Sequence, residues 1–200
     1  MKTTNVFFSQ SKVSTIDFEN KNGHKGCVIW LTGLSASGKS SIAIETQKAL
    51  FNLGYNSYIL DGDNIRQGLN KDLGFSPEDR AENIRRIAHV AKLFRDSGQI
   101  VIVAFISPYK SERQLARDLI EKDRFIEVFV KCPIDVCRKR DPKGLYEKAI
   151  NGLIKDFTGI NAPYEEPESP EIVLNTDILS IYDSAEEIIK KLKNLNIISL

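Results

Sequence analysis

Residues 33–40 read Gly-Leu-Ser-Ala-Ser-Gly-Lys-Ser and fit the pattern G-x-x-x-x-G-K-[ST]. An apolar run at 27–32 precedes them and a helix-forming run at 41–45 follows, so the order is strand, loop, helix. In such a loop the backbone amides turn inward around a phosphate chain, and the N-terminus of the helix adds partial positive charge. Lys39 can reach the terminal phosphates, and the Ser40 hydroxyl can ligate Mg²⁺.

An accidental match in a Gly/Ser loop is the alternative, but the flanking strand and helix stand where the mechanism needs them. The motif therefore predicts a nucleoside triphosphate site. The residues expected to line it are Gly33, Leu34, Ser35, Ala36, Ser37, Gly38, Lys39, Ser40 and Ser41.

The rest of the chain continues this alternation of strand and helix. Short β-rich runs occur at 27–32, 57–60, 100–106, 125–130 and 171–174, with helical stretches between them. Such alternation is typical of βαβ units, in which helices cover both faces of a parallel sheet. We therefore predict an α/β fold of the P-loop NTPase type, with a parallel sheet of about five strands.

Capping residues mark three helix starts. Ser76 precedes Pro77, which suits a first helical position, and the segments that begin at Ser111 and Ser184 read as capping boxes. The helix that begins at Pro77 repeats apolar residues with a helical period and should bury them on the sheet. These residues are Ile84, Ile87, Ala88, Ala91 and Phe94. The basic residues between them, Arg85, Arg86, Lys92 and Arg95, should face solvent.

Composition and charge exclude several classes of protein. At 200 residues and 42% hydrophobic, the chain suits one globular domain with a well-filled core. Its 28 basic and 27 acidic residues nearly cancel, so no overall field attracts nucleic acid or an acidic membrane. The longest wholly apolar run, 100–106, is far shorter than the roughly 20 residues that span a bilayer. A small-molecule partner is the expectation.

Two features indicate a cytoplasmic protein. The first ten residues lack the apolar core of a signal peptide and the Arg-rich bias of a transit peptide. The three cysteines, Cys27, Cys132 and Cys137, make an odd count without zinc-site spacing, so we expect reduced thiols. Residues 1–24 are polar and irregular, and we expect an extension or a loosely docked arm.

Polar residues gather where the predicted strands end, which is the edge at which open parallel sheets bind ligands. Asp61, Asp63 and Arg66 follow the second strand. Arg80 and Asn83 lie in the first two turns of the next helix, which starts at the same edge, and could clamp an anion. Turns with solvated charges are the alternative. Ser107 follows the third strand, where a plain strand-ending turn is also open.

Two later segments could complete a site at this edge. Residues 138–144 concentrate four positive charges, as a basic lid over a polyphosphate would, although a charged surface gives the same pattern. Residues 156–160 place Phe157 beside Gly159 in a loop, where the aromatic ring could stack on a base. Each signal is weak alone.

Taken in order, these segments resemble the adenosine 5′-phosphosulfate (APS) kinases, also called adenylyl-sulfate kinases. The resemblance runs from about residue 23 to the C-terminus. It rests on the motifs at 33–40, 60–66, 68–75, 79–86, 105–109, 140–146 and 156–160. Gln67 and Asn161 depart from the family pattern, which usually has His and often Asp at these positions.

The resemblance implies a reaction and a role for each segment. The family transfers the γ-phosphoryl group of MgATP to the 3′-hydroxyl of APS, which gives 3′-phosphoadenosine 5′-phosphosulfate (PAPS) and ADP. Lys39 would hold the β- and γ-phosphates, Ser40 would ligate Mg²⁺ with help from Asp61, and Arg140 would border the ATP adenine. Asp63 would orient or deprotonate the 3′-hydroxyl.

The second substrate, APS, is implied to bind across the remaining segments. The residues placed around it are Arg66, Phe75, Arg80, Asn83, Ile106, Ser107, Lys143 and Phe157, with Ile106 and Ser107 acting through their backbone. Phe75 and Phe157 would sandwich the adenine. Some family members have been ascribed a phosphoserine at the position of Ser107, but no base neighbours it in the sequence, which favours substrate binding. The resemblance also implies a homodimer, with a kinase domain over residues 25–200.

Three other functions compete with this interpretation. Another small P-loop kinase, acting on a nucleoside monophosphate or a metabolite hydroxyl, would explain the loop and the lid but not Asp63, Arg80, Asn83 and Phe157 together. A GTPase would need Asn-Lys-x-Asp, and residues 70–73 end in Leu. A non-catalytic module would be expected to lack Lys39, Ser40 or one of the aspartates, and all are present.

Overall fold

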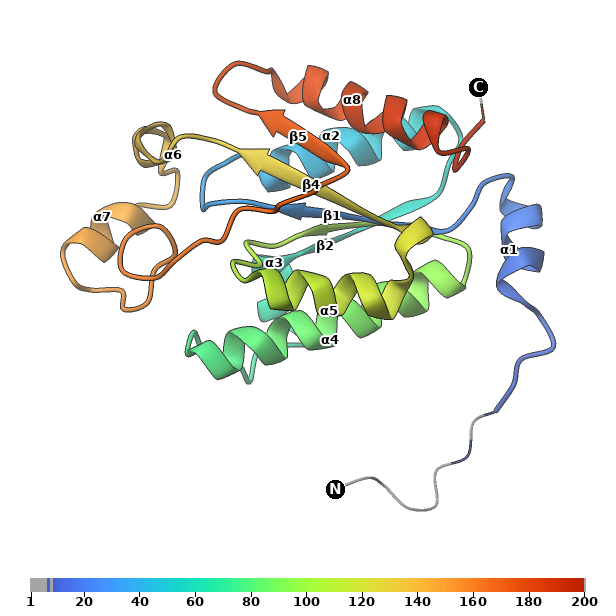
Figure 1. Ribbon diagram of the computed structural model, residues 1–200, viewed down its shortest axis with the longest axis horizontal. Helices are drawn as coiled ribbons and strands as arrows, with labels where there is room; N and C mark the ends of the chain where they lie inside the picture. Colours follow the sequence, from blue (N-terminus) through green and yellow to red (C-terminus); the bar gives the residue numbers. More distant parts are fainter. Residues whose placement is uncertain (1–6, 8, 200) are drawn as a thin grey trace.

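Five parallel strands form the centre of the molecule in the order β2-β3-β1-β4-β5 (Figure 1). This computed structural model describes residue 7 and residues 9–199. The strands are β1 (Cys27–Thr32), β2 (Ser57–Asp61), β3 (Ile100–Ala104), β4 (Phe125–Lys131) and β5 (Ile172–Asn175). The predicted parallel α/β sheet is confirmed. The third strand is shorter than predicted, because Ser107 turns into a left-handed conformation and Pro108 has no amide to continue a ladder.

Helices cover both faces of the sheet. They are α1 (Thr15–Asn22), α2 (Lys39–Asn52), α3 (Gly62–Arg66), α4 (Pro77–Asp96), α5 (Lys110–Ile120), α6 (Ile134–Arg140), α7 (Leu145–Ile150) and α8 (Ile181–Asn194), with a 3₁₀ turn η1 (Lys122–Arg124). Helices α2 and α8 lie on one face and α4 and α5 on the other (Figure 1). Successive residues of β1 alternate between the two layers, with Ile29 packed towards α2 and Trp30 towards α4.

The buried face of α4 matches its apolar period, with one correction. Ile84, Ile87, Ala88 and Ala91 are buried, and Phe94 is partly buried. Arg95 was predicted to face solvent, but it is only 7% exposed. It donates to the Ile120 carbonyl at the end of α5 and pairs with Glu121, both at 2.6 Å, so helix packing covers it.

Only the first of the three predicted caps is correct. Ser76 accepts a hydrogen bond from the Asp79 amide and α4 begins at Pro77. Helix α5 instead begins at Lys110 after Tyr109, which leaves Ser111 inside its first turn. Helix α8 begins after Ser180, whose side chain accepts from the Asp183 amide. In both wrong cases a helix-compatible residue precedes the predicted cap, and the helix extends back over it.

Part of the N-terminal extension forms a docked helix. Ser14 and Asp17 form a capping box for α1, which the sequence analysis missed. Its Glu19 accepts from the Gly26 amide at 2.9 Å and pairs with Arg124 at 3.2 Å. Helix α1 lies at the amino edge of the sheet, far from the carboxyl edge (Figure 1). Residues 1–6 and 8 of the extension lie outside the described residues.

Two further observations concern the chain as a whole. Cys27, Cys132 and Cys137 are buried and free. In the described part of the chain, every helix is too short or too polar to cross a lipid bilayer.

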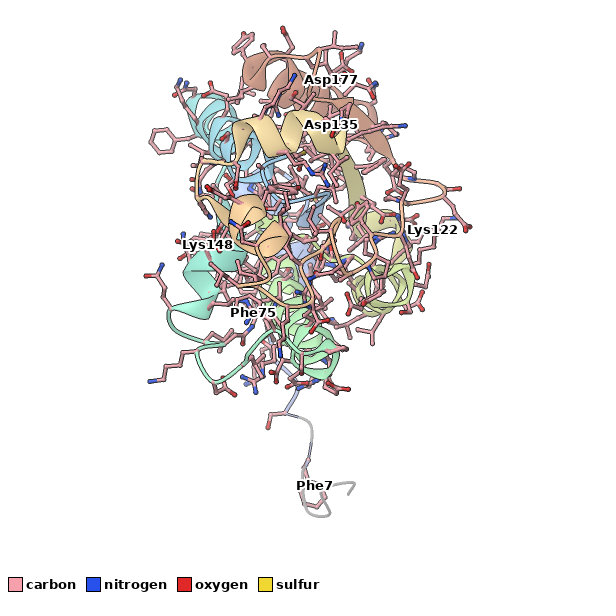
Figure 2. All side chains as sticks on the ribbon, turned by 90° about the vertical axis from the view of Figure 1, so that its left-hand side faces the viewer. Phe7, Phe75, Lys122, Asp135, Lys148 and Asp177 are labelled. Carbon is pink, nitrogen blue, oxygen red and sulfur yellow. The ribbon has the colours of Figure 1, made fainter. Side chains whose placement is uncertain are left out.

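Helices α6 and α7 form the predicted basic lid at the carboxyl edge (Figure 1). Both carboxylate oxygens of Asp141 accept amide hydrogens of α7, from Leu145 at 2.9 Å and from Tyr146 at 3.0 Å. Beneath the lid, Tyr146 and Phe157 pack edge to face with ring centroids 5.0 Å apart. Figure 2 views this edge directly, with Lys148 of α7 above Phe75. The lid therefore has its own small apolar base.

Candidate active site

The loop at residues 33–40 connects β1 to α2 at the carboxyl edge of the sheet. Gly33 has a φ of +152°, and a Cβ there would lie 2.5 Å from the carbonyl oxygen of Val130. Only glycine fits so close to β4. Gly38, with φ at +107°, directly precedes the first turn of α2. The loop is thus held tightly, and the free amides of the α2 N-terminus face it.

Lys39 is buried in this loop without a carboxylate partner. Its Nζ donates to the carbonyl oxygens of Gly33 at 2.9 Å and Leu34 at 2.6 Å. Burial removes water from the ammonium and lowers the pKa of Lys39 from 10.5 to about 8. Among the described residues, no carboxylate lies within 4 Å of it. A bound phosphate would supply the negative counter-charge that this ammonium lacks.

Ser40 and Asp61, the two residues predicted to hold Mg²⁺, contact each other. The Ser40 hydroxyl donates to Asp61 Oδ2 at 2.7 Å, at the start of α2 and the end of β2. Hydroxyl and carboxylate oxygens are ligands that Mg²⁺ prefers, and Mg²⁺ in nucleotide sites takes its remaining ligands from phosphates and water. The donor set therefore fits Mg²⁺ brought with a nucleotide.

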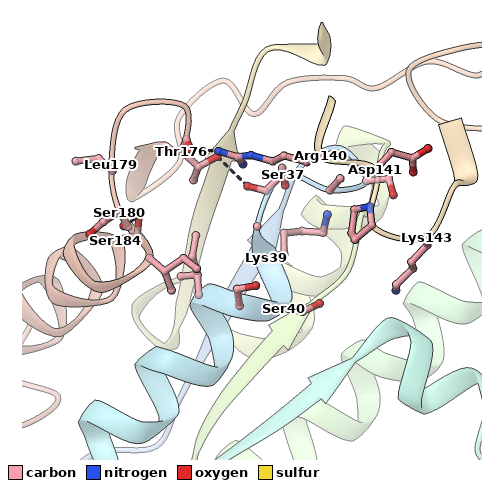
Figure 3. A pocket seen from close by; sticks show the side chains of 17 residues that line it. Ser37, Lys39, Ser40, Arg140, Asp141, Lys143, Thr176, Leu179, Ser180 and Ser184 are labelled. Atoms are coloured by element: carbon pink, nitrogen blue, oxygen red, sulfur yellow. Dashed lines mark hydrogen bonds between the residues drawn. The ribbon is translucent and has the colours of Figure 1, made fainter. Parts of the chain in front are cut away.

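A pocket of about 780 Å³ opens beside the loop (Figure 3). Residues 35–42 and the lid residues 140–143 line two sides of it. Arg140 crosses from the lid, donating to the Thr176 carbonyl and, at 3.6 Å, to Cys132 Sγ. The predicted nucleotide-binding residues Ser35 to Ser41 and Arg140 are thus brought together.

The third side of this pocket was missed by the sequence analysis. It consists of the turn between β5 and α8 and the first turn of α8, with Thr176, Leu179, Ser180, Ile181 and Ser184. Thr176 Oγ1 donates to the Ser37 carbonyl at 2.8 Å and ties this turn to the loop (Figure 3). The sequence could have indicated this wall, because Thr176 stands at the carboxyl end of a predicted strand, as Asp61 and Ser107 do.

Arg66 and Arg80 meet around Phe75, on the β2 side of the edge. The Arg66 guanidinium lies 4.4 Å from the Phe75 ring centroid, and Arg80 Nε donates to the Phe75 carbonyl at 2.9 Å. Burial and the neighbouring Arg80 lower the pKa of Arg66. Two cations held this close repel each other until an anion binds between them.

The arginines of the chain separate into two groups, those that pair with a carboxylate and those that do not. Every arginine outside the predicted site pairs with a carboxylate within 4 Å. These are Arg85, Arg86, Arg95, Arg113, Arg117, Arg124 and Arg138. Within the described residues, Arg66, Arg80 and Arg140 have no such partner; they bond only carbonyl, hydroxyl or sulfur atoms. The three arginines without anionic partners are the three that the sequence analysis placed in the site.

Asn83 is buried on α4 and held by a residue that the sequence analysis did not assign. Asn70 Nδ2 donates to Asn83 Oδ1 at 2.8 Å. This bond occupies the Asn83 oxygen and leaves its amide hydrogens available to an acceptor. Asn70 itself is fully buried. The contact could not be predicted from the sequence, because Asn70 lies in the turn after α3 and meets Asn83 only through tertiary packing.

Phe75 and Phe157 lie on either side of Arg80. The guanidinium that bonds the Phe75 carbonyl also reaches the Asp156 carbonyl and, at 3.0 Å, Thr158 Oγ1. Phe75 is 63% exposed, whereas Phe157 is 8% exposed against Tyr146. Asn161 Oδ1 accepts from the Phe157 amide, so Asn at this position closes the turn. The predicted sandwich of a base between the two rings stays a prediction.

Asp63 and Lys143 contact each other across the mouth of the site. The Lys143 ammonium pairs with Asp63 Oδ2, and both side chains are more than half exposed. Asp63 also lies beside the cation pair, because its amide donates to Asp61 Oδ1 at 3.0 Å. The lid is therefore linked to the α3 start by one ion pair.

The Ser107 side chain points into the core rather than into the site. Its Oγ accepts a hydrogen bond from Trp30 Nε1 at 3.0 Å, and the residue is 2% exposed. No His, Lys or carboxylate contacts this hydroxyl among the described residues, so no base is in place to activate it. The backbone of Ile106 and Ser107 lies just past the carboxyl end of β3.

Ser107→Ala is expected to change kcat by less than about threefold, while leaving the buried Trp30 N–H unpaired and lowering stability by about 1–3 kcal/mol. Steady-state kinetics and thermal unfolding of the variant measure both. A loss of kcat of about a thousandfold or more in a folded variant would instead indicate an obligatory phosphoserine.

Comparisons with known proteins point to one family. A family model described as adenylylsulphate kinase matches residues 25–175. An adenylyl-sulfate kinase from Staphylococcus haemolyticus is 54% identical over 197 residues, which cover 98% of this chain and 99% of that protein. A probable adenylyl-sulfate kinase from Bacillus subtilis is 55% identical over 194 residues, covering 97% and 98%.

A solved structure is similar in both sequence and fold. It is the Mycobacterium tuberculosis APS kinase CysC in complex with AMPPNP and APS, at 48% identity and a TM-score of 0.81. The match covers 85% of this chain and 99% of that one.

Proposed function

This chain belongs to the adenylylsulphate kinase family and is an ATP-dependent phosphotransferase, and we propose how its residues transfer the γ-phosphoryl group of ATP to the 3′-hydroxyl of APS. The products are PAPS and ADP. The reaction needs two anionic nucleotides held in line, with their charge neutralised as the phosphoryl group passes between them.

The three arginines without a carboxylate partner in the described part of the chain, together with the buried Lys39, are the observation that carries the proposal. Lys39, Arg66, Arg80 and Arg140 have no carboxylate partner among the described residues, and all four lie at the carboxyl edge. Lys39 and Arg140 line the pocket beside the loop, while Arg66 and Arg80 flank Phe75. The pair Lys39 and Arg140 would bind one anionic nucleotide beside the loop, and the pair Arg66 and Arg80 would bind the other beside Phe75.

On the ATP side, the loop amides and Lys39 would hold the β- and γ-phosphates, and Arg140 would border the base. Ser40 and Asp61 would hold Mg²⁺, which when bound supplies positive charge to the phosphate oxygens. The Thr176–Ser184 segment would form the wall opposite the lid.

On the APS side, Arg66 and Arg80 would bind the phosphosulfate, with Asn83 donating from its free amide hydrogens. Phe75 and Phe157 would stack on the adenine, a contact worth about 1–3 kcal/mol per base in single-strand binders. Asp63 would orient the 3′-hydroxyl or take its proton. Lys143 would exchange its contact with Asp63 for one with the substrate anion, which frees Asp63 for that role.

An acceptor panel tests this function. ADP release is measured with MgATP and one acceptor at a time: APS, AMP, or a sugar acid such as gluconate. We expect kcat/KM for APS to exceed that for either other acceptor by at least about a hundredfold, or about 2.7 kcal/mol. Equal or higher turnover of AMP would indicate a general nucleotide kinase instead.

Two properties implied by the family resemblance extend this proposal. We propose that the chain forms a homodimer and works in the cytoplasm, with the kinase domain over residues 25–200 and an extension at 1–24. Light scattering during gel filtration measures the assembly, and twice the monomer mass of 22.5 kDa is expected.

A further inference from the structure

The segment that leaves β3 has an unusual backbone at Ser107. Its φ is +39°, a left-handed conformation that costs a non-glycine residue energy unless its surroundings hold it. Thr32 Oγ1 donates to the Ile106 carbonyl at 2.7 Å and lies 3.3 Å from the Ser107 carbonyl. Arg113 Nη1 donates to the Ser107 carbonyl at 2.7 Å. Two side chains thus hold both carbonyl groups of the turn.

This arrangement directs the amide group of Ser107. A trans peptide places its C=O and N–H in opposite directions, so holding the Ile106 carbonyl against Thr32 turns the Ser107 N–H away from β1. Neither the Ile106 nor the Ser107 amide donates a hydrogen bond to any residue in the described ranges. Pro108, the next residue, has no N–H. The turn therefore presents two unused donors at the end of a central strand.

Arg113 also fixes this turn to its surroundings. It is 3% exposed, and its Nε donates to Glu127 Oε1 of β4 at 2.8 Å. Its Nη2 donates to the Glu165 carbonyl at 2.7 Å, in the segment that follows Phe157 and Thr158. One planar guanidinium thus joins the β3 end, β4 and the loop that carries Phe157. The five donors of the rigid guanidinium fork allow this triple contact with one fixed geometry.

We propose that Arg113, acting with Thr32, is a positioning residue for the acceptor nucleotide: it holds the Ile106–Ser107 turn so that its two free amides donate to APS. The inference rests on the proposed function, since it names what shapes the APS half of that site. Arg113 itself does not reach the substrate. Its buried ion pair with Glu127 anchors the guanidinium, and the bond to Ser107 transmits that position to the site.

Arg113→Met removes the donor that holds the Ser107 carbonyl. The turn can then relax towards an extended conformation, and the Ser107 N–H loses the direction that the left-handed turn gives it. We expect KM for APS to rise about tenfold, the effect of losing about one charge-assisted hydrogen bond. KM for ATP should stay within about twofold, because the loop at 33–40 keeps its contacts.

Arg117→Met is the matched control. Arg117 lies one turn further along α5 and also bonds Glu127, at 3.2 Å, together with Glu171, but it does not contact the turn at 106–108. Both variants remove a guanidinium from the same carboxylate, so both should lose stability. Only Arg113→Met should raise KM for APS. A merely structural role would give the two variants the same kinetics.

Thr32→Val and Thr32→Ser provide a second test that leaves the buried ion pair intact. Valine keeps the shape of the side chain and removes the hydroxyl, so KM for APS should rise severalfold. Serine keeps the hydroxyl, so KM for APS should stay near the wild-type value. If Arg113→Met does not fold, this pair decides the proposal. Unchanged KM for APS in Thr32→Val, or an equal rise for Arg117→Met, would overturn it.

The wild-type protein is assayed first, in the same experiment. If it forms no PAPS from APS, the proposed function fails and the variants are not interpreted through it. If it forms PAPS and the variants show no selective effect on APS, the function stands and the role of Arg113 is refuted.

Discussion

Lys39→Met is expected to lower kcat/KM by at least about a hundredfold without destabilising the protein. The activity is lost because Lys39 supplies the buried positive charge for the β- and γ-phosphates, and removing one such donor from a water-excluded site typically costs about 10²–10³ in rate. Stability should hold or rise, because burial lowers the pKa of Lys39 to about 8 and so disfavours the ammonium in the folded protein. Methionine fills the same space without that charge.

Lys48→Met, on the same helix, is the control. Its ammonium is 64% exposed and pairs only with Glu45 at the surface. It should keep full activity and change the unfolding temperature little. A large fall in the unfolding temperature of Lys39→Met, or activity within tenfold of wild type, would contradict the role assigned to Lys39.

Asp63→Asn is expected to reduce kcat by about 10²–10⁴, the usual contribution of a general base, while the affinity for ATP changes little. The substitution keeps the side-chain shape and the backbone bond to Asp61, so the Ser40–Asp61 pair remains in place. It also weakens the contact with Lys143. Steady-state kinetics and a direct nucleotide-binding titration separate the two effects.

Asp72→Asn is the matched control for this substitution. Asp72 is 56% exposed and pairs with Arg86, much as the 64% exposed Asp63 pairs with Lys143, but it lies outside the site. Turnover should be unaffected. Near-normal kcat in Asp63→Asn would show that the 3′-hydroxyl needs no base from this residue and that positioning alone suffices.

Local periodicity predicted the sheet well, because the buried strands are dense apolar runs. β1 has the predicted bounds, β2 and β4 each extend one residue beyond the predicted C-terminal end, and β5 begins and ends one residue later than predicted. The helical period of α4 could have predicted that Arg95 is buried, since Arg95 lies four residues after the buried Ala91 on the same helix face. Its charge suggested solvent exposure, yet the buried guanidinium pairs with Asp96 and Glu121 and donates to the end of α5.

Much of the site followed from one topological rule, that ligands bind at the carboxyl ends of parallel strands. That rule places the segments at 61–66, 80–83, 106–107 and 140–143 at one edge, where the structure has them. It says nothing about supporting contacts. Asn70 reaches Asn83 across 13 residues, and Arg113 reaches Glu165 across 52, so only the folded chain brings them together. Likewise, only the folded structure shows which arginines have a carboxylate partner, and so only the structure separates the site arginines from the others by this criterion.

A single-turnover experiment tests the central claim most directly. The protein is mixed with ATP labelled at the γ-phosphate, Mg²⁺ and APS, quenched at successive times, and the labelled species are separated. Direct in-line transfer predicts that label passes from ATP to the 3′-phosphate of PAPS, only when APS is present, with no labelled protein at any time. Label on the protein before PAPS forms, or transfer of label to AMP when AMP replaces APS in a parallel mixture, would contradict this account.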